Sequence, residues 1–339
     1  MVLDTLGPLT ARSEPLRWME IPDPQPGRGE ILIRISACGV CHTELDEIEG
    51  RTPPPRLPVV LGHQVVGRVV SRGPGVRTVA VGDRVGVAWI HAACRRCPSC
   101  RRGDENLCPR FRATGRDVDG GYAELMVVAA GFAHAIPDVL GDTEAAPLLC
   151  AGAIGYRALR LCELHQGSTL GLFGFGASAH LVLQMVRQQL RRSPVYVFAR
   201  SARQRAFARR LGAHWCGGID TASPVLLDAA IDTTPAWRPV LRALESLRPG
   251  GRLVINAIRK EGADHDILLD IDYERHLWQE KAIKSVANVT RADVREFLAL
   301  AARRGIRPEV EEFPLQDANR VLLELKQGQL RGAEVLRIA

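Results

Sequence analysis

Apolar and polar residues follow a two-residue period in short runs along the first 150 positions. Glu30–Ala37 and Leu61–Ser71 are two such runs, the pattern expected of strands with one buried face. The segments GPGV and VGDRVGV then supply turns and a further strand. This part of the chain is therefore predicted to form an antiparallel β domain.

From about residue 151 the pattern changes to alternating strands and helices. The expected strands are Ser168–Phe175, Pro194–Ala199, Asp228–Asp232 and Gly251–Ala257. The expected helices are Ala177–Leu190 and a helix capped by Ser201 and stopped by Gly212. Repeated strand–helix–strand units predict a parallel sheet with right-handed crossovers.

The segment after about Ser285 has a mixed pattern. It holds a helix opened by Thr290 and Asp293, a strand near Glu309–Phe313, a helix from Gln316 and a closing strand Ala333–Ile338. The pattern leaves open whether this segment extends the parallel sheet or returns to the first domain.

Composition agrees with two globular cores. Of 339 residues, 46% are hydrophobic and 24% charged, which excludes disordered, collagenous and membrane-spanning proteins. The uncharged stretch Leu164–Val186 contains glycines and polar residues, so we expect no bilayer span. The N-terminus shows no basic region followed by an apolar block, and the expected location is the cytoplasm.

The net charge of +7 is concentrated in one segment. Residues 186–210 contain eight arginines and no acidic residue. A solvated arginine-rich surface and a nucleic-acid partner both fit such a run. Because few aromatic residues accompany it, we expect no nucleic-acid partner.

The nine cysteines point to metal sites rather than disulfides. Four of them fall within 15 residues, at Cys94, Cys97, Cys100 and Cys108. Four thiolates at this spacing can enclose a structural zinc ion. A second, dispersed set consists of Cys38, Cys41, His42, His63 and Cys150. Two thiolates and one imidazole from it would form a donor set typical of catalytic zinc, although spacing alone favours ordinary buried residues.

A glycine-rich turn connects the first expected strand of the parallel sheet to its helix. The motif is GxGxxA, formed by Gly174, Gly176, Ala177 and Ala179. In this context it predicts a dinucleotide pyrophosphate at the helix N-terminus. No acidic residue occurs between Glu163 and Asp220 to bind the ribose of NAD. The second strand is instead followed by Arg200, Ser201 and Arg203, which favours NADP over NAD.

Taken together, these motifs resemble the zinc-dependent alcohol dehydrogenases of the medium-chain dehydrogenase/reductase superfamily. The ordered segments that carry the resemblance are CGVCHTE, GHQVVGRVV, VGDRVGV, the four-cysteine segment, GGYAEL, the cysteine before AGAIGY, GFGASA and SVANVTRAD. The resemblance implies an α/β protein with a GroES-like catalytic domain (residues 1–150 and 285–339) and a Rossmann doubly wound parallel-sheet domain (151–284).

The resemblance also implies a role for individual residues. Two zinc ions are expected per chain: a catalytic one on Cys41, His63 and Cys150, and a structural one on Cys94, Cys97, Cys100 and Cys108. Thr43 would take the alcohol proton, and the last proton transfer would go through Asp46 or directly to water. Glu44 would orient His63. His42 would approach the cofactor phosphates, and Trp89 and Ile154 would line the substrate pocket.

Some positions depart from the usual family pattern. Gln64 stands where glutamate is common, Asp46 where histidine is common, Ile154 where threonine is frequent and Ala333 where arginine is frequent. These differences leave open a binding protein of the same fold without turnover. The expected function is hydride transfer between NAD(P) and a small alcohol, aldehyde or ketone by a homo-oligomer, a dimer or tetramer.

Overall fold

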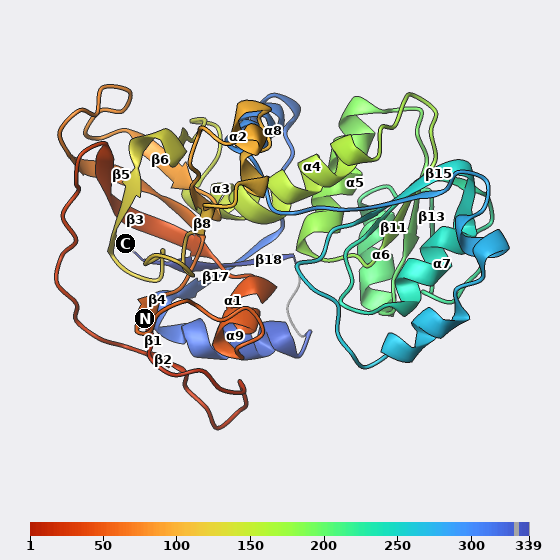
Figure 1. Cartoon of the computed structure of the whole chain (residues 1–339), viewed down its shortest axis with the longest axis horizontal. Coiled ribbons are helices and arrows are strands. Elements are labelled where there is room, and N and C mark those ends of the chain that lie inside the picture. The colour runs from red at the N-terminus through yellow and green to blue at the C-terminus, as the bar shows by residue number, and fades with distance from the viewer. Residues whose placement is uncertain (329–331, 339) are drawn as a thin grey trace. The chain divides into compact units, whose positions relative to one another are not determined.

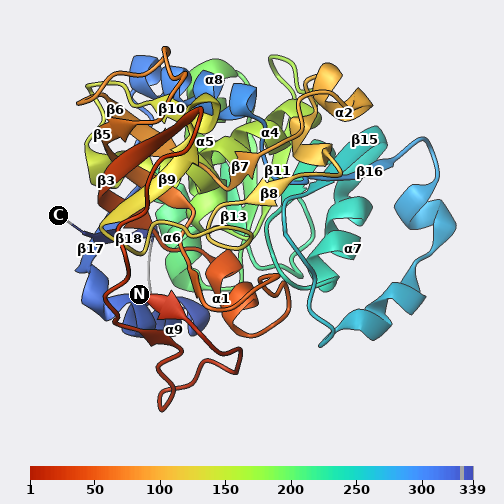
Figure 2. The same cartoon turned by 60° about the vertical axis from the view of Figure 1, so that its left-hand side comes forward.

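The computed structural model describes residues 1–328 and 332–338, which form two compact units. The first unit comprises residues 1–153 together with the chain from Asn288 onward, and the second comprises Ile154–Ala287. Figures 1 and 2 show the strands of each unit and the helices packed beside them. Among the described residues, no helix is both long and apolar enough to cross a bilayer.

The first unit is built on one curved sheet with the order β10-β6-β5-β3-β18-β17, to which β9 is added against β3. The strands are β3 (Glu30–Gly39), β5 (Gln64–Arg72), β6 (Arg84–Val87), β9 (Leu125–Ala129), β10 (Ala133–Ala135), β17 (Val310–Pro314) and β18 (Ala333–Arg337). All neighbours are antiparallel except β17 and β18. The predicted antiparallel β domain is confirmed for the first 150 residues.

The C-terminal segment returns to this sheet. Strand β18 pairs antiparallel with β3, with Leu336 opposite Cys38. Helix α8 (Arg291–Arg304) begins at the predicted Thr290–Asp293 capping box, and α9 (Ala318–Lys326) lies between β17 and β18 in the chain. The C-terminal segment therefore returns to the first domain and does not extend the parallel sheet, a choice that the sequence pattern left open.

Short elements complete the first unit. The strands β1 (Val2–Leu3), β2 (Leu16–Arg17) and β4 (Val59–Val60) form a small sheet, and β7 (Ile90–Ala92) pairs with β8 (Arg112–Ala113). Three short helices, α1 (His42–Ile48), α2 (Pro98–Arg101) and α3 (Asp142–Pro147), are absent from the sequence prediction. They are too short to display a helical period, so they depend on packing rather than propensity.

The second unit is a parallel sheet with the order β13-β12-β11-β14-β15-β16. The strands are β11 (Leu170–Phe173), β12 (Val195–Phe198), β13 (Trp215–Gly217), β14 (Leu227–Asp232), β15 (Leu247–Ile255) and β16 (Ala282–Ser285). The crossover helices are α5 (Ala177–Gln189), α6 (Ala202–Arg210) and α7 (Arg238–Ser246), and α4 (Ala153–Leu161) precedes β11. This 3-2-1-4-5-6 order is that of a doubly wound dinucleotide fold.

Candidate active site

Three residues far apart in the sequence meet in the first unit. Cys41, His63 and Cys150 place one ligand atom each so that all three lie within 4.8 Å of one another. Cys41 caps α1, His63 immediately precedes β5, and Cys150 lies on the π-helical turn Leu148–Gly152. His63 Nε2 lies 3.2 Å from Cys150 Sγ. Two thiols and an imidazole in this arrangement fit the three protein ligands of a catalytic zinc ion.

Glu44 contacts both His63 and Cys41 and fixes their orientation. Its Oε1 lies 2.5 Å from His63 Nδ1, and its Oε2 accepts a hydrogen bond from the Cys41 backbone N–H at 2.8 Å. The Nδ1–H of His63 therefore donates to Glu44, and the lone pair of Nε2 faces the thiols. Hydrogen bonding with Cys150 holds the pKa of Cys41 well below its ordinary value, which favours the thiolate.

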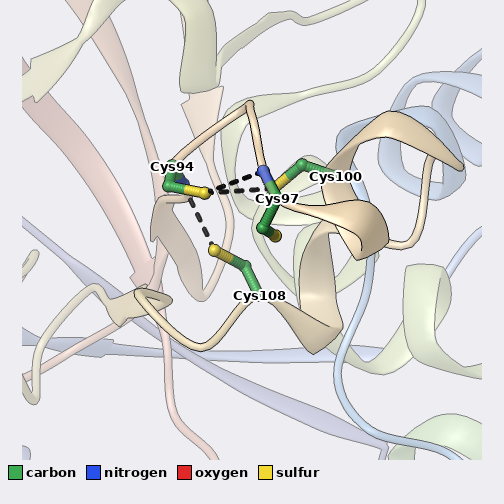
Figure 3. A group of neighbouring side chains, drawn as sticks. All are labelled: Cys94, Cys97, Cys100 and Cys108. Atoms are coloured by element: carbon green, nitrogen blue, oxygen red, sulfur yellow. Dashed lines mark hydrogen bonds between the residues drawn. The ribbon is translucent and has the colours of Figure 1, made fainter.

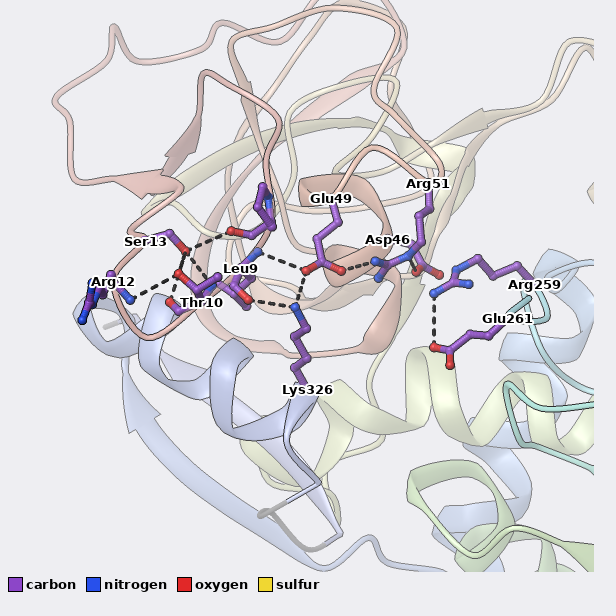
Figure 4. Close-up of polar contacts among 11 residues, drawn as sticks. Leu9, Thr10, Arg12, Ser13, Asp46, Glu49, Arg51, Arg259, Glu261 and Lys326 are labelled. Carbon is purple, nitrogen blue, oxygen red and sulfur yellow. Dashed lines mark hydrogen bonds and ion pairs between the residues drawn. The ribbon is translucent and has the colours of Figure 1, made fainter. Parts of the chain in front are cut away.

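Thr43 and Asp46 follow Cys41 on α1. The Thr43 hydroxyl lies 3.6 Å from Cys41 Sγ. Asp46 is buried, and its Oδ1 accepts a hydrogen bond from Arg51 Nε at 2.6 Å. Arg51 also pairs with Glu49, which in turn pairs with Lys326 (Figure 4). The proposed outer proton acceptor is thus already bound to a guanidinium, a contact that the sequence did not predict.

Sequence reasoning also missed Glu47. Its side chain is 1% exposed, and neither carboxyl oxygen has a hydrogen-bond partner among the described residues. Burial raises the pKa of Glu47 well above its ordinary value, with a smaller contribution from the nearby Glu44 carboxylate. Burial therefore favours the protonated form of Glu47, which lies on the same helix as Thr43 and Glu44.

Two further predicted residues lie around α1 and the cluster. The Trp89 ring meets the His63 ring edge-on with centroids 6.4 Å apart and packs against Phe111 at 5.4 Å. Trp89 therefore lies beside the imidazole, where its ring can limit the space for a substrate. His42, by contrast, is exposed at the start of α1.

A second cluster joins the four closely spaced cysteines. Cys94, Cys97, Cys100 and Cys108 lie with their sulfurs within 4.8 Å of one another (Figure 3). The Sγ atoms of Cys94 and Cys100 are 4.0 Å apart. A tetrahedron of thiolates with zinc–sulfur distances of about 2.3 Å has edges of about 3.8 Å, so the spacing fits zinc. The backbone N–H of Arg96 contributes most to lowering the pKa of Cys94 to about 6.

This cysteine segment is tied to α8 by an ion pair. Glu105, just before Cys108, accepts hydrogen bonds from the Arg291 backbone and from its guanidinium at 2.8–3.0 Å. Arg291 also lies over the Phe132 ring at 4.8 Å. The segment has little apolar core of its own, so these contacts and a metal ion would hold it in place.

The glycine-rich turn in the second unit has the shape that a dinucleotide requires. Gly174 has a φ of +84°, and a Cβ there would lie 2.7 Å from the Thr233 hydroxyl. Gly176 precedes α5, and a Cβ there would meet nothing within 4 Å, so its surroundings are open. Ala177 begins the helix and Ala179 is fully buried. Open backbone at a helix N-terminus fits a pyrophosphate.

The end of β12 carries the residues expected to choose between NAD and NADP. Arg200 and Ser201 are exposed, and the Ser201 hydroxyl caps α6 by accepting from Gln204 N–H. Arg203 is exposed on the first turn of α6. Arg205, which the sequence analysis did not single out, donates to the carbonyls of Ala199 and Arg200 at 2.7 and 2.8 Å. These two hydrogen bonds of Arg205 hold the loop between β12 and α6 in place.

Comparison with known proteins places these features in one family. Residues 27–138 match the alcohol dehydrogenase GroES-like domain. The chain is 45% identical to "Probable alcohol dehydrogenase AdhA" of Mycobacterium tuberculosis, over 96% of this chain and 93% of the relative.

Solved structures agree. A cinnamyl alcohol dehydrogenase from Sorghum bicolor is 28% identical with a TM-score of 0.83, covering 94% of this chain and 92% of that one. An acetophenone reductase from Geotrichum candidum, solved in complex with NAD, is 25% identical with a TM-score of 0.82, covering 98% and 96%. The predicted fold class, a GroES-like domain with a Rossmann parallel sheet, is confirmed.

Proposed function

This chain belongs to the zinc-type alcohol dehydrogenases of the medium-chain dehydrogenase/reductase superfamily, and from that premise we propose which of its residues carry out the reaction. The activity is reversible hydride transfer between a small primary or secondary alcohol and NAD(P). The observation that carries the assignment of residues is the convergence of Cys41, His63 and Cys150 next to the Thr43 hydroxyl.

Contacts in the first unit support the proposed roles. Cys41, His63 and Cys150 would hold a zinc ion, which would supply Lewis acidity toward an alcohol or, in the reverse direction, a carbonyl. The Thr43 hydroxyl accepts the alcohol proton and passes its own proton outward. Glu44 keeps Nε2 of His63 free of a proton. Trp89, beside His63, limits the size of the substrate.

This chain differs from the usual family pattern in the residue that follows Thr43 on the outward path of the proton. We propose Asp46 as the next acceptor, with its carboxylate held by Arg51.

In the second unit, the cofactor pyrophosphate would lie against Gly174, Gly176 and the start of α5. We propose a preference for NADP, because Arg200 and Ser201 are exposed at the end of β12 and no acidic residue follows that strand before Asp220. We assign the catalytic role to the first unit and cofactor binding to the second. The family resemblance also supports a cytoplasmic homo-oligomer.

A steady-state panel tests this function. The zinc-loaded protein is mixed with NAD or NADP and with ethanol, benzyl alcohol or the matching aldehydes, and the absorbance of reduced nicotinamide is followed. We expect turnover in both directions that a zinc chelator abolishes. Cofactor binding without turnover for any pair would instead indicate a binding protein of this fold.

A further inference from the structure

A hollow of about 310 Å³ opens near the C-terminal end of α5, in the second unit. Its lining includes Arg187, Arg191, Arg192, Ser193, Gly212 and His214. A neighbouring hollow of about 280 Å³ shares Arg187 and Arg191. We call the two together the arginine hollow. The glycine-rich turn lies at the other end of α5, and 13 helical residues separate the two by about 20 Å.

The three arginines of the hollow lack acidic partners. Among the described residues, no carboxylate lies within ion-pair distance of Arg187, Arg191 or Arg192. The sequence explains this, because no aspartate or glutamate occurs between Glu163 and Asp220. Other arginines of the same unit are paired: Arg238 with Asp220, Arg248 with Asp228 and Arg252 with Glu163.

The backbone around the hollow is fixed, while the three arginine side chains on it are exposed. Gly212 has a φ of +91°, and a Cβ there would lie 3.2 Å from the guanidinium carbon of Arg187. The glycine thus lets Arg187 lie close against the turn after α6. The buried Ser193 hydroxyl accepts from Gly167 N–H and donates to the His165 carbonyl. These bonds fix the turn that carries Arg191 and Arg192.

We propose that the arginine hollow binds a diphosphate group, separately from the cofactor. Guanidinium groups pair with phosphate oxygens through two parallel hydrogen bonds, and three of them balance the charge of a diphosphate. A volume of about 310 Å³ equals about ten waters at about 30 Å³ each, room for a diphosphate with part of its hydration shell. The exposed His214 ring, 5.4 Å from the Tyr196 ring, adds a donor at the rim. Free pyrophosphate and a nucleoside diphosphate share this chemistry.

Isothermal titration calorimetry tests the site. Pyrophosphate is titrated into the zinc-loaded protein saturated with NADP, so that the cofactor site is already filled, and zinc content is measured afterwards to exclude metal loss to pyrophosphate. We expect one equivalent to bind. The variant Arg187→Gln/Arg191→Gln should weaken binding at least tenfold.

The matched control is Arg303→Gln/Arg304→Gln. It removes the same charge from two exposed arginines in the last turn of α8, which line neither part of the arginine hollow, and binding should stay within about twofold of the wild-type value. If the double variant is insoluble, the single exposed substitution Arg191→Gln replaces it. A second arm with ADP identifies the source: tighter binding of ADP than of pyrophosphate indicates a nucleotide, and equal or weaker binding of ADP indicates the free anion.

Three results would overturn the proposal. These are no saturable binding of either ligand, equal weakening in the control variant, or competition with NADP. The site is tested by heat of binding rather than by turnover, so its failure leaves the proposed dehydrogenase activity untouched.

Discussion

Cys41 and Cys150 are the two side chains whose loss should separate catalysis from folding. Each contributes one sulfur to the cluster with His63, and neither lies in the core of the sheet. Cys41→Ser or Cys150→Ser leaves a poor zinc ligand, and we expect kcat to fall at least 1000-fold, since Lewis-acid assistance is worth several kcal/mol. Steady-state kinetics, with circular dichroism to check folding, measure this.

Cys216→Ser serves as the control for these variants. Cys216 is a buried thiol of the second unit that belongs to neither cysteine cluster in the described residues. The activity of the Cys216→Ser variant should stay near that of the wild type. If Cys41→Ser kept full activity while folded, the catalytic role of this cluster would be wrong.

Two glutamates of α1 allow a matched test of how His63 is oriented. Glu44 contacts His63 Nδ1, whereas Glu47 is equally buried and has no hydrogen-bond partner among the described residues. Glu44→Gln should lower zinc affinity and kcat by about 10- to 100-fold, because the amide holds the imidazole less strongly. Glu47→Gln changes a carboxyl that makes no hydrogen bond to His63 and should change both values less than about threefold.

The readout is zinc retention against a chelator together with kcat. An effect of the same size in both variants would mean that burial of a carboxyl on α1, rather than contact with His63, is what matters. Rescue of Glu44→Gln by excess zinc would support the positioning role.

At the residue scale, the sequence predicted which residues are candidates for the site better than it predicted the contacts between them. The spacing of Cys94 to Cys108 was enough to predict a metal cluster, because close thiols have few other uses. Cys41, His63 and Cys150 needed the family resemblance, since their separation in the chain exceeds any local pattern. The ion pair of Asp46 with Arg51 and the unpartnered carboxyl of Glu47 depend on how α1 packs, which no spacing rule describes.

Among the individual elements, the loop between β12 and α6 tests cofactor preference. Arg200 is exposed there, and Arg205 fixes the carbonyls on either side of it. Arg200→Asp should lower the NADP/NAD ratio of kcat/KM by at least tenfold, because a charge-assisted bond to the 2′-phosphate is lost and a ribose hydroxyl gains an acceptor. Arg304→Asp on α8 is the control for net charge. An unchanged ratio would show that this loop does not choose the cofactor.

Strand β18 carries a pH-dependent contribution to stability. Burial, more than its charged neighbours, raises the pKa of Glu334 from 4.5 to about 7. The folded state therefore prefers protonated Glu334: that stabilisation is fully present below about pH 4.5 and is lost as the pH rises through about 7.

Glu334→Gln removes this titration. At pH 8 the variant should be more stable than the wild type by up to about 3 kcal/mol, and at pH 4.5 the two should be similar. Urea unfolding of the zinc-loaded proteins at the two pH values measures the difference. A gain of equal size at both pH values would contradict a titrating Glu334.

At the scale of elements, the prediction was partial. Helices α5 and α8 and the parallel strands β11, β12, β14 and β15 show clear periods or caps, and the structure confirms them, whereas β13, β16, α4 and α7 were not predicted. Helices α1 to α3 span seven residues or fewer, too short for an amphipathic period to show. Strand β18 is apolar enough to join either sheet, so only tertiary pairing with β3 places it.

For the molecule as a whole, the order of motifs along the chain was more informative than any single motif. A glycine-rich turn or a group of cysteines occurs in many folds, whereas their fixed order over the full chain identifies one family. Composition and charge limited the class of protein, but they could not distinguish a cofactor phosphate site from the arginine hollow, because both draw on the same acid-free segment.

The two cysteine clusters together predict how much metal the whole chain holds and what each ion does. We expect two zinc ions per chain by elemental analysis, and one in each of Cys41→Ser and Cys97→Ser. The melting temperature should fall clearly only in Cys97→Ser, because the segment from Cys94 to Cys108 has little core and depends on its metal, while β5 is held by the sheet and α1 packs against α9. Calorimetry on the soluble fraction of each variant measures this. One zinc ion in the wild type, or equal melting temperatures in the two variants, would show that the clusters are not separate catalytic and structural sites.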